Sequence, residues 1–125
     1  MFLRIALLAQ TVAVLVQAVT AGLLLSTPGG RTAHSATAIG VVVTVLLHLV
    51  AALLTTVPGS RAPSTRQRST ILPAVGMLAM TVVQVALGLA HMKAFHVPLG
   101  VLMFGVSMVR LNQVWSVGRA KTASA

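Results

Sequence analysis

The chain contains no cysteine, no aspartate and no glutamate among its 125 residues, and only 3% of its residues are aromatic. The absence of cysteine excludes a disulfide framework, thiolate chemistry, iron–sulfur ligation and covalent c-type haem attachment. The absence of carboxylate side chains excludes carboxylate acid–base catalysis and Ser-His-Asp triads. These absences direct attention to the histidines, of which there are four.

Apolar residues dominate what remains, at 57% of the chain with a mean hydropathy of +0.98. A soluble domain of this size cannot bury so much apolar surface, so lipid is the expected solvent. Apolar stretches of about 20 residues, enough to cross a bilayer, lie at about 5–25, 35–57, 71–90 and 96–116. We interpret the first as a retained span and not a cleaved signal peptide, because no soluble domain follows. Short connections predict a single all-α membrane domain over residues 1–125, folded as an up-down-up-down four-helix bundle.

The basic residues are distributed unequally between the two ends of these predicted helices. Seven of the nine are expected on one side: Arg4, Arg61, Arg66, Arg68, Arg110, Arg119 and Lys121. Only Arg31 and Lys93 are expected on the other side. The positive-inside rule then predicts a multi-pass protein of the bacterial inner membrane with both termini in the cytoplasm. The net charge of +9 is thus interpreted as a topology signal and not as a nucleic-acid-binding surface.

An internal repeat relates residues 10–52 to residues 77–112. The first and third stretches contain "VQAVTAG" and "VQVALG", with Gln17 and Gln84 at matching positions. Each stretch leads to an outer turn with one basic residue, which is followed three residues later by His34 or His96 and then by a glycine. The pattern predicts two copies of a helical hairpin.

Two such hairpins would place His34 and His96 at the same depth, on diagonal helices of the bundle. Paired imidazoles across a bundle core suit the two axial positions of one b-type haem. Arg31 and Lys93 are then expected to contact the haem propionates. Gly100 lies one helical turn after His96, where a missing side chain would admit the porphyrin plane.

These features resemble one four-helix half of the haem A synthase family, and also small four-helix bacterial membrane proteins with the same histidine pattern. The resemblance covers roughly residues 8–115 and rests on His34, His96, Gln84 in "QVALG" and Gly100 in "HVPLG". In that family each half carries histidines at the outer ends of its second and fourth helices, and one half holds a b-type haem between them. The family's active half uses a glutamate that this chain lacks, so oxidation of a haem methyl group is not expected.

The remaining polar residues admit simpler interpretations. Gln10 and Gln17 are seven residues apart and share a helix face. The side-chain amides of Gln17 and Gln84 are expected either to form hydrogen bonds with neighbouring helices or to contact the haem edge or a quinone. His48 is expected to be a buried imidazole bonded to a backbone carbonyl or a hydroxyl, with a proton or quinone role as the alternative. A second haem at His48 is not expected, because the matching position is Arg110.

The sequence therefore predicts a small membrane cytochrome that holds one bis-histidine haem b near the outer face. Its task would be electron transfer or haem handling with a larger membrane redox system, without independent catalysis. The alternative is a cofactor-free accessory or assembly subunit of a membrane complex. Copper binding by His91, Met92 and His96 is a third hypothesis. Small residues such as Ala18 and Gly22 could also serve a homo-oligomer.

Overall fold

The computed structural model describes residues 1–55 and 65–123, with side chains described over 1–55 and 68–116. These residues form four helices: α1 (Phe2–Ser26), α2 (Gly30–Leu54), α3 (Thr65–Leu89) and α4 (Lys93–Ala123). Each contains a segment long and apolar enough to cross a membrane. Arg61 lies outside the described residues, and so do the side chains of Arg66, Arg119 and Lys121.

The helices begin earlier than the apolar stretches predict. The α2 helix begins at Gly30, where the prediction was residue 35, and α3 begins at Thr65, where it was residue 71. The α4 helix continues to Ala123, well past the predicted end at residue 116. Hydropathy detects only the apolar middle of a helix, whereas backbone hydrogen bonds continue through its polar ends.

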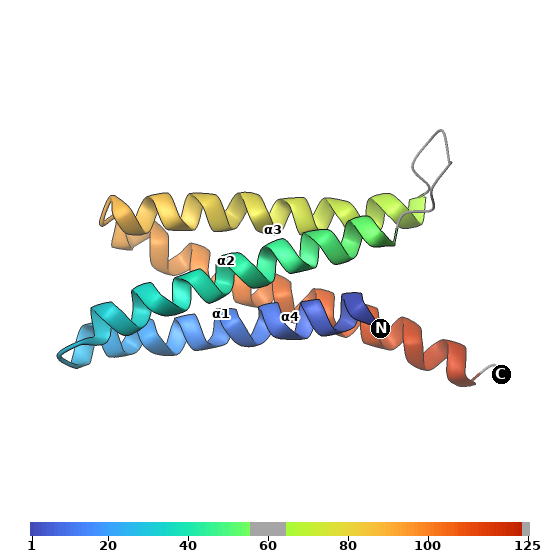
Figure 1. Cartoon of the computed structure of the whole chain (residues 1–125), viewed down its shortest axis with the longest axis horizontal. Helices are drawn as coiled ribbons and strands as arrows, with labels where there is room; N and C mark the ends of the chain where they lie inside the picture. The colour runs from blue at the N-terminus through green and yellow to red at the C-terminus, as the bar shows by residue number, and fades with distance from the viewer. Residues whose placement is uncertain (56–64, 124–125) are drawn as a thin grey trace.

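The four helices form a ring in which each one contacts two others. The α1 helix packs against α2 and α4, and α3 packs against the same two helices. Consequently α2 and α4 occupy diagonal positions, as do α1 and α3. The α1–α2 and α3–α4 turns lie at one end of the bundle, which is called the turn end below, while α1 begins and α4 ends at the other (Figure 1).

An apolar layer crosses the middle of the bundle. Its buried members come from all four helices: Val14, Val41, Val45, Met77 and Met103. Outward-facing apolar side chains are exposed along every helix, as at Leu25, Ile39, Leu72 and Val101. A surface of this kind suits lipid and not water.

Buried positions match between the two hairpins, at one sequence offset for α1 and α3 and at a shorter one for α2 and α4. In α1 and α3 the matched pairs are Leu7/Ala74, Gln10/Met77 and Val14/Thr81. In α2 and α4 they are Val41/Met103 and Val45/Ser107. The two hairpins therefore present equivalent faces to the centre, as the repeat predicts.

The two turns also match in backbone conformation. Gly29 (φ 84°) and His91 (φ 57°) are left-handed, and each lies two residues before Arg31 or Lys93. At the end of α3 the N–H groups of Met92 and His91 donate to the carbonyls of Leu87 (3.0 Å) and Gly88 (3.1 Å), which is a Schellman motif. The first hairpin is longer because α1 runs nine residues beyond Gln17, whereas α3 runs five residues beyond Gln84.

Replacing Gly30 with alanine should destabilise the first turn strongly. A Cβ at Gly30 would overlap the backbone of Leu23, including its carbonyl group, and backbone atoms cannot move aside as a flexible side chain can. We expect a loss of about 2–3 kcal/mol in the free energy of unfolding, measured by denaturant titration in detergent. The control is Gly22→Ala, where the added Cβ meets nothing within 4 Å. Equal stability of the two variants would contradict the packing described for this turn.

Candidate functional site

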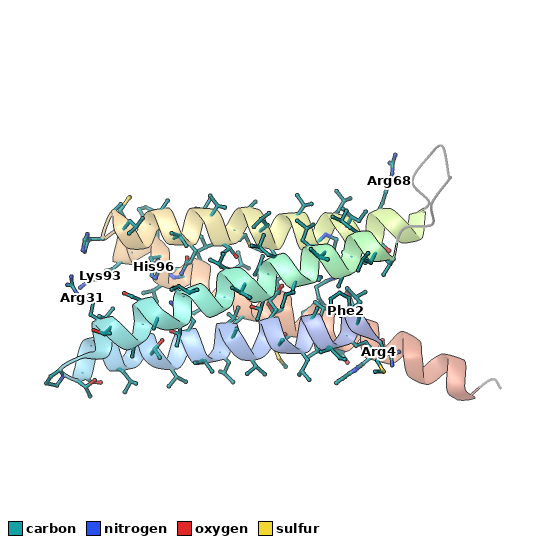
Figure 2. All side chains as sticks on the ribbon, viewed as in Figure 1. Phe2, Arg4, Arg31, Arg68, Lys93 and His96 are labelled. Carbon is teal, nitrogen blue, oxygen red and sulfur yellow. The ribbon has the colours of Figure 1, made fainter. Side chains whose placement is uncertain are left out.

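The structure brings His34 of α2 and His96 of α4 together across the bundle. Their ring centroids lie 6.1 Å apart and the ring planes are inclined by 72°. Both side chains are half-buried, within the first turns of their helices. His96 lies inside the bundle near the turn end, close to the end that carries Arg31 and Lys93 (Figure 2). The predicted meeting of the two imidazoles is thus present in the structure.

The His34 ring is held by side chains of α1. Its Nε2 lies 3.2 Å from Nε2 of Gln17, and its Nδ1 lies 3.3 Å from Oγ1 of Thr20. Because an amide nitrogen can only donate, Nε2 of His34 accepts and its Nδ1–H donates to Thr20. The Thr20 hydroxyl donates in turn to the backbone carbonyl of Gln17 (3.0 Å). Thr37 of α2 completes the network by donating to Oε1 of Gln17.

The His96 ring is held by Gln84 of α3 in a reciprocal pair of hydrogen bonds. Nδ1–H of His96 donates to the backbone carbonyl of Gln84 (3.0 Å), and the Gln84 amide donates to the backbone carbonyl of His96 (2.8 Å). The ring packs over Gly88, where a Cβ would lie 3.1 Å from Cε1 of His96. Within the described part of the chain, Nε2 of His96 has no hydrogen-bond partner.

Gly100 faces Gln84 in the structure. A Cβ at Gly100 would lie 3.0 Å from Nε2 of Gln84, so the glycine makes room for the amide. Oε1 of Gln84 is buried and has no hydrogen-bond partner among the described residues. Gly100, which was expected to admit a porphyrin plane, therefore lies beside an amide with one unsatisfied acceptor.

Arg31 and Lys93 lie at the turn end, in the first turns of α2 and α4 (Figure 2). Both side chains are exposed. Neither makes a hydrogen bond within the described residues, and the chain contains no carboxylate side chain with which they could pair. Their positive charges are therefore available to an external anion near the histidine pair.

A second polar layer lies on the far side of the apolar layer. Nδ1–H of His48 donates to Oε1 of Gln10 (2.8 Å), and Nε2 of Gln10 donates to Oγ of Ser107 (3.1 Å). Gln10 and Ser107 are fully buried. The prediction of a backbone carbonyl or hydroxyl as the partner of His48 is wrong, because the acceptor is a side-chain amide. Ser107 was not singled out in the sequence, although it is an isolated hydroxyl within an apolar stretch.

The structure gives less support to the copper hypothesis than to the histidine pair. No cluster of three or more His, Cys, Asp or Glu side chains occurs among the described residues. His91 and Met92 are exposed at the α3–α4 turn, whereas Met77 and Met103 are buried in the apolar layer. Packing accounts for these two buried methionines.

The residues present fit a bis-histidine haem in their donor set, because two imidazoles from diagonal helices meet across the bundle. The observed separation of the ring centroids is 6.1 Å. In both histidines Nδ1–H has a hydrogen-bond acceptor, so Nε2 is the atom that would ligate an iron; in His34 this atom accepts a hydrogen bond from Gln17.

Comparisons with protein-family models, with curated proteins and with solved structures give no match for this chain. The resemblance to a half of haem A synthase stays a prediction, and the functional argument rests on the geometry of the site.

Proposed function

We propose that the chain is a small membrane b-type cytochrome that holds one haem b between His34 and His96. The observation that carries the proposal is the 6.1 Å separation of two imidazoles from diagonal helices. The four helices would cross the membrane in up-down-up-down order. Electron transfer or haem handling beside a larger membrane redox system is the function that this arrangement supports best.

The charges at the two ends support one orientation in a bacterial inner membrane. Arg4 and Arg68 lie at the end opposite Arg31 and Lys93 (Figure 2). Arg110 is also well removed from the turn end, being 17 residues after Lys93 along α4. The positive-inside rule then places both termini in the cytoplasm and the histidine pair near the outer face.

The polar partners of the histidines would prepare them for ligation. The Thr20 hydroxyl and the Gln84 carbonyl orient the two rings and make Nε2 of each more basic. Ligation through Nε2 of His34 would replace its hydrogen bond from Gln17. Gln17 and Gln84 are then the amides beside the cofactor, and Oε1 of Gln84 has no hydrogen-bond partner within the described ranges 1–55 and 68–116.

Arg31 and Lys93 would hold the propionates by charge-assisted hydrogen bonds. A bound haem supplies one-electron transfer, and two histidine ligands leave no open position for oxygen. The apolar layer of Val14, Val41, Val45, Met77 and Met103 separates this site from the second polar layer. Independent catalysis is accordingly not part of the proposal.

The test is an absorption spectrum of the full chain, expressed with haem available and purified in detergent. We expect a Soret band, the split visible bands of a low-spin reduced b-type haem, and about one haem per chain. A folded but colourless protein would refute the proposal.

A cofactor-free accessory subunit is the second candidate function. It is favoured by one observation, namely that both ring nitrogens of His34 already have protein partners. A colourless preparation that co-purifies with a larger membrane complex would support it.

A further inference from the structure

No acidic side chain is available to neutralise the charge of Arg110. Arg110 lies in the candidate membrane span Lys93–Ser116, and the sequence contains no aspartate or glutamate. One terminal nitrogen donates to the backbone carbonyl of Ser69 (2.8 Å) and the other to Oε1 of Gln113 (2.7 Å). Both acceptors are neutral, and Nε is buried without a hydrogen-bond partner among the residues that the structure describes. The guanidinium is anchored in place while its charge stays uncompensated.

The anchored guanidinium still has donors to offer. A guanidinium has five N–H groups, and two of them are used in the bonds to Ser69 and Gln113. The unused N–H groups of the two terminal nitrogens remain for an outside acceptor, because those bonds lie at the protein surface. Phosphate oxygens match this planar group well.

An apolar groove on the outer face of α4 leads to Arg110. Its volume is about 490 Å³, and its lining consists of Val101, Leu102, Gly105, Val106, Val109 and Arg110. From Val101 to Arg110 the helix rises about 13 Å. Gly105 lies in the middle of this lining and has no side chain, and a Cβ placed there would meet nothing within 4 Å. A narrow apolar surface thus ends at a fixed positive charge.

We propose that this groove binds one anionic phospholipid, with its phosphate on Arg110 and an acyl chain along α4 over Gly105. Arg110 lies 17 residues after Lys93, which is about 25 Å along the helix. It therefore reaches the far boundary of a hydrocarbon core that is about 30 Å thick. This is the end that carries Arg4 and Arg68 (Figure 2), where anionic headgroups of the cytoplasmic leaflet attract basic residues. The site does not depend on a haem.

The test measures lipid retained by the full chain in detergent after exposure to equal amounts of dioleoyl phosphatidylglycerol and dioleoyl phosphatidylcholine. Native mass spectrometry should show one phosphatidylglycerol, preferred about tenfold over phosphatidylcholine. Arg110→Gln should abolish the preference. Arg68→Gln is the matched control, because Arg68 is exposed and does not line the groove.

A second variant keeps the charge and fills the groove. Gly105→Leu should reduce retention of phosphatidylglycerol about tenfold, because a side chain would occupy the acyl path. It should not disturb the bundle, since its Cβ points into open space. Gly76→Leu is the matched control, at an equally open glycine on α3.

Three outcomes would overturn the proposal. The first is an unchanged preference for phosphatidylglycerol in Arg110→Gln. The second is a loss of that preference in Arg68→Gln when Arg110→Gln retains it. The third is displacement of the lipid by glycerol phosphate at equal concentration, because that result would show a phosphate site that makes no use of the groove.

Discussion

Replacing His96 with alanine should remove the low-spin haem spectrum and lower haem retention by at least about tenfold. Loss of partners around metal ligands already costs about 10–100-fold in affinity, and here a ligand itself is removed. His34→Ala should behave alike, because the two rings meet across the bundle as a pair. The measurements are the Soret absorbance per chain and the spin state of the remaining haem.

The control for this prediction is His91→Ala. His91 is exposed at the α3–α4 turn and lies outside the histidine pair, so its loss should leave the spectrum unchanged. Added imidazole should restore the low-spin spectrum to His96→Ala, because it can occupy the space left by the ring over Gly88. A merely structural role for His96 would not produce this rescue. An unchanged spectrum in both His34→Ala and His96→Ala would rule out the two histidines as axial ligands.

Replacing Gln10 with leucine should lower the free energy of unfolding by about 3 kcal/mol. The substitution removes the acceptor of His48 Nδ1–H and the donor to Ser107 Oγ, in a layer where all three side chains are buried. A buried polar group left without a partner costs about 1–3 kcal/mol. Denaturant titration in detergent measures the loss, and Asn112→Leu at an exposed position is the matched control.

The double variant Gln10→Leu/His48→Leu tests whether the loss in the free energy of unfolding comes from leaving His48 without its hydrogen-bond acceptor. Removing both members of a buried hydrogen bond is milder than removing one, so the double variant should lose less than the sum of the single variants. The haem spectrum should survive Gln10→Leu, because the apolar layer lies between Gln10 and the histidine pair. Additive losses would show that Gln10 and His48 are not coupled.

The repeat is the feature from which most of the site could be predicted. Matching His34 with His96 and Gln17 with Gln84 in the sequence placed equivalent residues on equivalent helices. The structure brings the two histidines together and gives each a glutamine neighbour. The two glutamines act differently, however. Gln17 bonds the imidazole of His34 through its side-chain amide, whereas Gln84 bonds the imidazole of His96 through its backbone carbonyl. Repeat pairing cannot distinguish these uses, because the two turns join helices of unequal length.

The contacts of the second polar layer could not be predicted from sequence patterns. Gln10 and Ser107 are 97 residues apart and meet only because α1 packs against α4. No local periodicity reports that contact. For the same reason the partner of His48 was wrongly expected to be a backbone carbonyl or a hydroxyl.

The sequence by itself determined the number of helices, the relation between the two hairpins and the placement of the two histidines near the beginnings of the second and fourth helices. These properties depend on apolar length and on a repeated order of residues, both of which are local. Only the tertiary structure decided the separation of the rings, the hydrogen-bond partners of each ring nitrogen, and the groove that ends at Arg110. These depend on how closely diagonal helices approach, which is set by side-chain packing such as that of His96 over Gly88 and of Gln84 against Gly100.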